Sequence, residues 1–566
     1  MKKILKIILA LGIVVFGATS CSNWLDVNES PNVATEPNMR LMLTGVQWRM
    51  AVELGHTSNR IGIPLGVAVQ HTTTREQNDH NFNPASVGFT NTWFTTYTEL
   101  FQTLNALMRE AEVNDALHFR GIARILKAFT FMTFVDIWGE VPFSQAFDLQ
   151  TYTHPAPDRG QDIYNALFVM LRGAREDLYA GNSNPQFPIG AADLFYGGQI
   201  VNWVRLANSL QFRMLVNTRH VRGMINDWDG LLAEVIDRDD RIRGGTTAAA
   251  SSNFQFAHTT AIGPPDERNP GFPHSYTAGH TQFPSAWIWE VMNGLTYNHV
   301  DNPLADIVDP RVPFYFFRQL APDQTTNVTL PYRQGTFMAV FFGDNSPYRD
   351  ASVANYATVW GIFPVGGRFD IGEGGDRGDL QYTANGAVPQ RFYTFADMLF
   401  NEAEMTLVNL MPGGVSRTRE IFSEAIDAAF DHLQLVVTGL PGVPTGVIPA
   451  AARNAYRDAV LARFDAATSD DDRMHLIMLQ KWIHNVHNAT EAFTSLRRTG
   501  FPVLFNPNVR GGFDPYTGEV RATSNTFNFP NTMPWPQNEV DRNRNMPQRD
   551  LVNPVRPFWM PETINL

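Results

Sequence analysis

The chain has 566 residues and carries a net charge of −12, with 56 acidic against 44 basic side chains. A nucleic-acid-binding protein needs a basic footprint, so this acidic balance argues against nucleic acid as a partner. Apolar residues make up 44% of the chain, which is ordinary for a globular protein with a sizeable core. The length allows several domains, but no Gly/Ser-rich or charged linker separates them, so one large globule is as consistent with the sequence as several domains.

The first 21 residues have the layout of an export signal. Three lysines fall within the first six residues, residues 7–16 are apolar, and residues 17–20 are small. This order of basic, apolar and small residues is typical of a cleaved signal peptide. The apolar run is too short for a membrane-spanning helix, which needs about 20 residues.

Cys21 follows the small residues directly and is the only cysteine in the chain. It has no partner for an internal disulfide, so an exported protein needs another reason to keep it. Residues 18–21 read Ala-Thr-Ser-Cys and resemble a bacterial lipobox, with Ala in the usual place of Leu. We expect Cys21 to be the lipid anchor of a mature chain with net charge −15. The alternative is a buried, inert thiol.

Beyond a turn-rich tether over residues 22–38, apolar residues recur at helical spacing in the N-terminal part of the chain. Each stretch has one wide apolar face, as in helices that pack in layers. The spacing predicts helices over 41–54, 93–111, 119–135, 163–178 and 200–215.

Residues 240–390 differ, because they are rich in Gly, Pro, Asn and aromatic residues and show little sustained period. Such long irregular chain inside a compact protein usually carries function. Helical spacing returns over 395–403, 421–433 and, as one long helix, 474–496. We therefore predict a mainly α fold of tetratricopeptide-like helix pairs with long irregular segments on one side, although no clean 34-residue repeat occurs. The expected parts of the globule 39–566 are helical pairs (39–235), a ligand-side segment (236–390), C-terminal helices (391–498) and an irregular tail (499–566).

No catalytic signature is present: the nucleophile-elbow, P-loop and His-Glu-x-x-His patterns are all missing from the sequence. His484 and His487 could share a metal ion, but no third ligand is evident from spacing, so structural or surface histidines are favoured. Glu402 and Glu404 lie about 200° apart on a helix and cannot form a facing acid–base pair.

One Gly-rich stretch carries three acidic residues, Glu373, Asp376 and Asp379. Their oxygens could hold Ca²⁺, but their spacing does not match the calcium-binding loop of an EF-hand. A solvated loop is the favoured interpretation, and we expect no cofactor.

Polar and aromatic residues gather in two segments, 70–82 and 255–300. Aromatic faces suit the C–H faces of sugar rings, while amides and guanidinium groups bond hydroxyls, and the same mixture suits peptides. For Trp287 the alternative is the core of a helix over 285–292. The expected ligand-binding residues are Gln70, Arg75, Asn78, Tyr276, Trp287 and Tyr297.

Six segments, in order along nearly the whole chain, carry a family resemblance. Residues 136–142 match a "D-x-[YWF]-G-D-V-P" turn with Glu140 in place of the second Asp, and residues 203–213 match "W-x-K-F-A-N-S-L-x-x-R" with Arg205 in place of Lys. The matching segments are 21–28, 120–143, 203–213, 309–311, 496–502 and 534–545. On these segments the sequence resembles the SusD/RagB family of Bacteroidota outer-membrane lipoproteins.

The resemblance implies a core of four tetratricopeptide-like helix pairs with irregular segments on one side. It also implies a cell-surface protein, not an enzyme, that captures nutrients, often glycans. Its expected partner is a SusC-type TonB-dependent outer-membrane transporter, which such proteins cover like a lid. Ligand residues vary within the family, so the resemblance assigns none here.

Four functions remain open on the sequence alone. The favoured one is capture of oligosaccharides for a transporter, and the first alternative is the same role with peptides. An unrecognised hydrolase would need a close carboxylate pair in a cleft. A purely structural lid would bind neither glycan nor peptide.

Overall fold

The structure is a computed structural model, and the residues that it describes begin at the end of the predicted tether. The described residues are 38–57, 60–74, 82–148, 150–245, 247, 251–276, 282–296, 301–322, 324, 333–334, 337–338, 355–378, 384–440, 442–444, 448–505, 512–513, 520–521, 529–549 and 555–564. Cys21, Arg75, Asn78, Tyr297 and Asp379 lie outside them.

Helices dominate the described N-terminal part of the chain, and a π-helical turn, η1, joins α5 to α6 within the predicted helix 93–111. These elements are α2 (Met39–Leu54), α3 (Gly62–Ala68), α5 (Val87–Thr95), η1 (Thr96–Leu100), α6 (Phe101–Val113), α7 (Leu117–Trp138), α8 (Gly160–Tyr179), α9 (Ile200–Asn217) and α10 (Trp228–Arg238), with 3-10 turns η2 (Gly190–Ala192) and η3 (Arg222–Met224).

The middle of the chain has only short helices, whereas long ones return towards the C-terminus. The short helices are α11 (Gly271–Tyr276), α12 (Ala286–Met292), α13 (Val312–Tyr315) and α14 (Ile362–Val365). The later helices are α15 (Phe395–Leu407), α16 (Gly414–Val437), α17 (Ala450–Ala466), α18 (Asp470–His484), α19 (Ala489–Thr499) and α20 (Gln537–Arg542).

The described strands are short and pair two by two in antiparallel fashion, so no extended sheet forms from them. The pairs are β1 (Thr72–Thr74) with β5 (Gln282–Pro284), β2 (Val141–Pro142) with β3 (Pro157–Asp158), β4 (Phe254–Phe256) with β10 (Gln390–Tyr393), β6 (Phe316–Phe317) with β9 (Val359–Trp360), β7 (Arg333–Gln334) with β8 (Phe337–Met338), and β11 (Gly512–Phe513) with β12 (Val520–Arg521).

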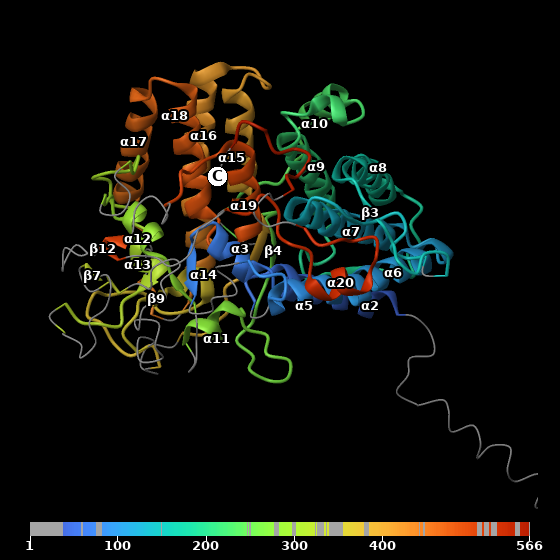
Figure 1. Cartoon of the computed structure of the whole chain (residues 1–566), viewed down its shortest axis with the longest axis horizontal. Coiled ribbons are helices and arrows are strands. Elements are labelled where there is room, and N and C mark those ends of the chain that lie inside the picture. Colours follow the sequence, from blue (N-terminus) through green and yellow to red (C-terminus); the bar gives the residue numbers. More distant parts are fainter. Residues whose placement is uncertain are drawn as a thin grey trace, which may run out of the picture.

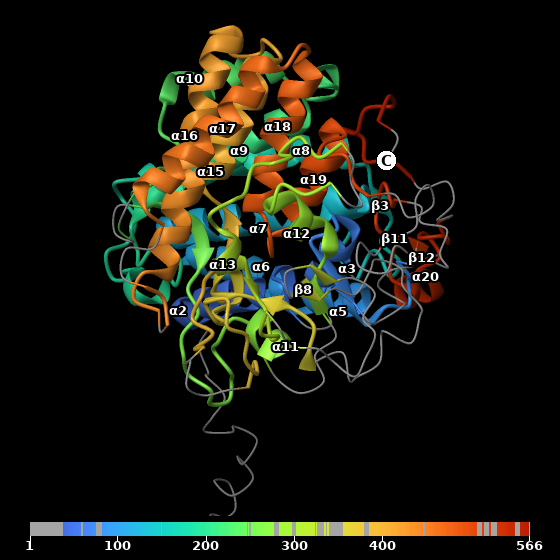
Figure 2. The ribbon, with the colours of Figure 1, turned by 90° about the vertical axis from the view of Figure 1, so that its left-hand side faces the viewer.

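Successive helices pack against each other through their apolar faces, as α6 with α7, α7 with α8, α8 with α9, and α15 with α16. Figure 1 shows α15 to α18 side by side, with α6 to α9 to their right. The short elements α11 and β9 lie below α15 to α18 in the same view. In Figure 2, turned by 90°, the short elements α11 and β8 likewise lie below α15 to α18. One continuous core runs from α2 to the residues after α20. The predicted mainly α fold with irregular segments on one side is confirmed; the division into parts stays a prediction.

Local sequence signals explain where several of these helices begin. Thr394 accepts from the backbone N–H of Asp397, whose carboxylate accepts in return from the Thr394 N–H, forming a capping box at α15. Ser469 and Asp472 form the same motif at α18. Each box satisfies backbone donors that a helix start leaves without a partner.

The single long helix predicted over 474–496 is wrong, because the chain breaks between α18 and α19. Asn485 ends α18, and its side-chain amide donates to Asp397 Oδ1 at 2.6 Å. His487 has a positive φ of 63°, which a continuous α-helix does not allow. The apolar spacing continues across the break, so spacing alone could not reveal it.

Candidate functional site

The two segments predicted to bind ligand meet in the structure. β1 pairs with β5, so that Thr73 lies opposite Phe283. Beyond the strands, the N–H and hydroxyl of Ser285 donate to the carbonyls of His71 and Gln70. Residues 70–74 and 282–285 therefore form one joined unit on the loop-rich side of the molecule.

Gln70 is buried at this junction, with 1% of its surface exposed. Its amide nitrogen donates to the carbonyl of Phe505 at 2.6 Å, and its amide oxygen accepts from the Phe505 N–H at 3.0 Å. Through these two hydrogen bonds the Gln70 side chain pairs with the backbone of the segment after α19. Gln70 thus holds two distant parts of the chain together.

Tyr276 and Trp287 are also buried. The Tyr276 hydroxyl donates to the carbonyl of Trp360 at 3.0 Å and accepts from the Arg368 N–H at 2.8 Å, and burial raises its pKa. Trp287 is 5% exposed on α12, and its ring centroid lies 6.2 Å from that of Trp482. The described contacts of Gln70, Tyr276 and Trp287 are with the protein, and ligand contact by them stays a prediction, as it does for Arg75, Asn78 and Tyr297.

Trp287→Ala is expected to act first on stability, with a loss of about 3–5 kcal/mol, because it empties a large volume from the core. Urea unfolding followed by circular dichroism measures this loss. Leu41→Ala, on an exposed side chain of α2, serves as the control and should stay within about 0.5 kcal/mol of the wild type. An unchanged unfolding midpoint for Trp287→Ala would contradict the burial argument.

The two histidines considered as metal ligands face different neighbours. His484 Nε2 lies 2.8 Å from the Thr394 hydroxyl, whereas the ring of His487 stacks on His56 with centroids 3.8 Å apart. Burial lowers the pKa of His484 and His487 well below the ordinary value, which favours neutral rings. Among the residues that the structure describes, no three His, Cys, Asp or Glu side chains gather to hold a metal ion.

A buried network of charges joins four helices. Arg213 on α9 donates from Nη1 to Asp136 on α7 at 2.9 Å and from Nε to Glu491 on α19 at 2.6 Å. Lys481 on α18 donates to the other oxygen of Glu491 at 2.7 Å. All four side chains are at most 2% exposed, so each charge depends on these partners.

A second buried cluster surrounds Glu404 on α15. Arg498 on α19 donates to both carboxylate oxygens, at 2.8 and 2.7 Å, and Arg219 donates to one of them at 2.8 Å. Burial alone would raise the pKa of Glu404, but the two guanidinium groups lower it to about 2. Glu402 faces a different way and pairs with Arg241, in agreement with the angle expected between the two carboxylates.

The segments that carry the family resemblance supply much of this buried network. Asp136, Arg213 and Arg498 come from three of those segments, and a fourth supplies Asp309 and Arg311, a buried pair at 2.6 Å. These motifs therefore fix the packing of the helices. Their role is in the fold, and they leave the ligand undetermined.

An open hollow lies between α2 and the segment after β4; we call it the α2 cleft. Its volume is about 480 Å³, within the usual range of ligand pockets. β4 packs beside α2, so the cleft joins the N-terminal helices to the predicted segment 255–300. Its lining includes Thr44, Trp48, Leu194, Phe256, Thr259 and Glu267.

The α2 cleft combines an aromatic face with a polar edge. Trp48 is half-buried, and the Arg49 guanidinium lies 5.3 Å from its ring. On the opposite segment the Thr259 hydroxyl donates to Glu267 Oε2 at 2.7 Å, and the two residues also share a backbone hydrogen bond. The cleft can therefore contact an apolar face and accept or donate hydrogen bonds at its edge. Trp48 was not among the residues predicted from sequence.

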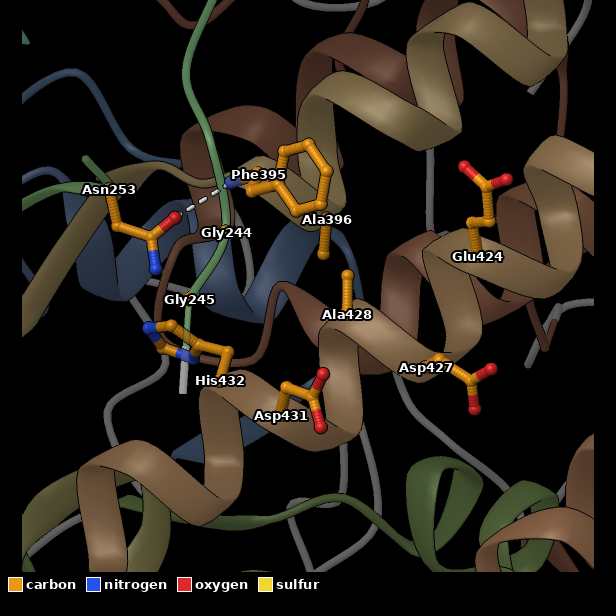
Figure 3. A pocket seen from close by; sticks show the side chains of 10 residues that line it. All are labelled: Gly244, Gly245, Asn253, Phe395, Ala396, Glu424, Asp427, Ala428, Asp431 and His432. Atoms are coloured by element: carbon orange, nitrogen blue, oxygen red, sulfur yellow. Dashed lines mark hydrogen bonds between the residues drawn. The ribbon is translucent and has the colours of Figure 1, made fainter. Parts of the chain in front are cut away.

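A second hollow of about 350 Å³ is lined by Gly244, Gly245 and Asn253 together with side chains of α15 and α16 (Figure 3). Asn253 accepts there from the Phe395 N–H at 2.8 Å. Asp427 and Asp431 on α16 line the hollow, but each pairs with an arginine of α17 at 2.8 and 2.7 Å. These carboxylates are engaged in helix packing, so we do not take this hollow as the site.

Two family models match the sequence. Residues 31–240 match SusD-like_2, described as "Starch-binding associating with outer membrane", and residues 382–550 match SusD-like, described as "Susd and RagB outer membrane lipoprotein". The chain belongs to the SusD/RagB family. The first match covers α2 to α10 and the second covers α15 to α20, so the two SusD-like regions flank the loop-rich middle.

Solved structures with the SusD-like fold superpose on nearly the whole chain. A SusD homolog from Bacteroides fragilis NCTC 9343 has a TM-score of 0.65 and 17% identity, over 93% of this chain and 99% of that one. A chitin-binding SusD homolog from Flavobacterium johnsoniae has 0.63 and 17%, over 93% and 100%. A structure titled chitin-binding protein has 0.63 and 19%, over 90% and 95%. At these identities the likeness shows the fold. A search of curated proteins finds no match.

Within the part of the chain that the structure describes, no helix combines the length and apolar character needed to cross a bilayer.

Proposed function

We propose that this protein is a cell-surface lipoprotein that captures oligosaccharides and delivers them to a SusC-type TonB-dependent outer-membrane transporter. Family membership over residues 31–240 and 382–550 carries the proposal. The family descriptions name starch binding and an outer-membrane lipoprotein, and two similar structures are titled chitin-binding. The proposal assigns binding to the chain and no reaction.

The α2 cleft is the proposed capture site. The Trp48 ring offers a flat apolar face for the C–H side of a sugar, while Thr44, Thr259 and Glu267 offer oxygens and hydroxyls for its polar edge. A hydrogen-bonded loop carries Thr259 and Glu267, so part of the ordering cost of binding is already met. Ligand contact by Arg75, Asn78 and Tyr297, which lie outside the described residues, stays a prediction from the sequence.

Trp48→Ala is expected to weaken saccharide binding by about 2 kcal/mol, roughly 30-fold, because an aromatic anchor in a cleft usually dominates the affinity. Calorimetry of the purified full chain with maltoheptaose and chitohexaose, and electrophoresis through gels containing soluble starch or glycol chitin, measure the loss. Trp48→Phe keeps a flat ring and should retain most of the affinity.

Gly45→Leu provides a matched variant that leaves Trp48 in place. A Cβ at Gly45 meets nothing within 4 Å, and Gly45 lines the α2 cleft, so we expect a leucine there to occupy part of the cleft. Leucine is also the better helix former, by up to about 1 kcal/mol. We expect Gly45→Leu to lose binding while its thermal midpoint stays the same or rises.

The remaining functions are separate outcomes of the same measurements. Full retention by both Trp48→Ala and Gly45→Leu would move the site away from the α2 cleft. Binding of a tryptic casein digest without any glycan binding would favour peptide capture. Shortened products after incubation with maltoheptaose would indicate a hydrolase, and co-purification with a transporter without ligand binding would indicate a structural lid.

A further inference from the structure

A separate cleft lies where the C-terminal helix α20 meets α5, η1 and the connection between β2 and β3; we call it the α20 cleft. Its volume is about 300 Å³, and residues more than 380 positions apart in the sequence line it. α5 and α20 lie next to each other in Figure 1. Because it shares no lining residue with the α2 cleft, the two can be altered independently.

Phe94 is the aromatic side chain that the α20 cleft presents to solvent, with 46% of its surface exposed. It comes just before the π-helical turn η1, where the N–H of Phe101 bonds the carbonyl of Thr96, five residues back. Such wide turns occur frequently at functional sites, because they shift the phase of the side chains along a helix. Its neighbour Trp93 also lines the cleft but is only 3% exposed and lies edge-on to Trp138, with ring centroids 5.2 Å apart.

Polar groups stand around Phe94 with unused bonding capacity. Arg542 and Gln102 are exposed, and neither side chain makes a hydrogen bond or ion pair with any residue that the structure describes. Glu539 uses one carboxylate oxygen to accept from Asn543 at 2.9 Å. The rim therefore offers a guanidinium group, an amide and a carboxylate oxygen to a ligand.

Hydrogen bonds between distant segments hold the walls of the α20 cleft in place. The Tyr97 hydroxyl donates to the carbonyl of Pro142 at 2.7 Å, and the Asn543 amide donates to the carbonyl of Pro155 at 2.9 Å. Both bonds tie the lining of one segment to another, so the cleft exists before a ligand binds. Preorganised walls reduce the ordering cost that binding must overcome.

We propose that the α20 cleft is a second saccharide-binding site, in which a neutral sugar ring stacks on Phe94 and bonds Arg542, Gln102 and Glu539. One cation and one anion face the cleft, so its lining suits an uncharged ligand rich in hydroxyls. The volume is at the lower end for ligand pockets, which fits a short stretch of glycan. This inference rests on the proposed function for its class of ligand.

A polysaccharide long enough to reach both clefts makes its second contact intramolecularly, which raises its overall affinity. A shorter glycan can bind either cleft as an independent event. Phe94→Ala should therefore lower retention in gels of soluble starch or glycol chitin at least threefold, and Arg542→Gln should lower it too. Phe94→Tyr keeps the ring and should retain binding. Thermal midpoints should be unchanged, because Phe94 is half-exposed.

The test uses the full chain as wild type, Trp48→Ala, Phe94→Ala and the double variant, in the same gels. Residual retention by Trp48→Ala that disappears in the double variant supports the second site. Retention by Phe94→Ala and Arg542→Gln equal to the wild type, while Trp48→Ala loses it, overturns the second site and leaves the proposed function standing. A wild type that none of these glycans retains overturns both.

Discussion

Replacing Glu404 with glutamine is expected to destabilise the protein by about 3–5 kcal/mol, the cost of leaving a buried charge without its partner. The carboxylate is fully buried between Arg498 and Arg219, and glutamine leaves both cations without an anion at that point. The neutral amide has nearly the same shape, so the loss comes from charge and not from packing.

Urea unfolding of the wild type and Glu404→Gln measures this difference. Glu420→Gln is the matched control, because Glu420 forms an exposed pair with Arg417 on α16. Exposed pairs contribute about 0–1 kcal/mol, so the control should unfold close to the wild type. Equal unfolding curves for Glu404→Gln and the wild type would mean that the buried cluster adds nothing net to stability.

The same cluster makes the stability of the protein sensitive to acid. The pKa of Glu404 is about 2 in the folded chain against an ordinary 4.5, so its stabilising effect is complete above pH 4.5. That effect, about 3 kcal/mol, is lost as the pH falls from 4.5 towards 2, because the unfolded chain then binds a proton that the folded chain excludes. The difference in unfolding free energy between wild type and Glu404→Gln should therefore shrink over this range.

Apolar spacing was sufficient to predict most long helices, and it failed where side-chain chemistry overrides spacing. The break between α18 and α19 is an example: Asn485 bonds Asp397, which is 88 residues away in the chain. The partners of Asp136, Arg213 and Arg498 were equally hidden, because each lies on another helix. Motifs marked these residues as important, but only the fold shows that Asp136 pairs with Arg213 and that Arg498 pairs with Glu404.

The candidate site was harder to predict, because residue type does not tell which way a side chain faces. Gln70, Tyr276 and Trp287 have suitable chemistry, yet packing of the loop-rich segment buries all three. Trp48 was not predicted as a site residue, because it lies within a predicted helix. It is not part of the apolar series of that helix, which is Leu41, Val46, Met50 and Leu54. A large aromatic residue outside the apolar series of a helix is the sequence signal that could have indicated a binding residue here.

The predicted lipid anchor at Cys21 leads to the prediction with the largest cellular effect. Cys21→Ala is expected to move the protein from the membrane fraction to the soluble fraction, because acyl chains contribute about 0.8 kcal/mol per buried CH₂ and several chains hold a protein stably. Fractionation with immunoblotting measures the shift, and mass spectrometry of the wild type should find acyl chains on Cys21. Ser22→Ala is the control and should stay with the membrane; an unmodified Cys21 thiol would contradict the anchor.

Cys21→Ala also separates capture from delivery. Cys21 precedes the helices by a predicted tether, so the released protein should bind glycan with wild-type affinity in calorimetry. Without the lipid, however, its concentration near a transporter falls from the high effective value of a membrane-anchored partner to that of the surrounding medium. Glycan uptake by cells should therefore drop even though binding is intact. Normal uptake with a fully released protein would contradict a role of the anchor in delivery. The variants would then test glycan capture in the α2 cleft alone.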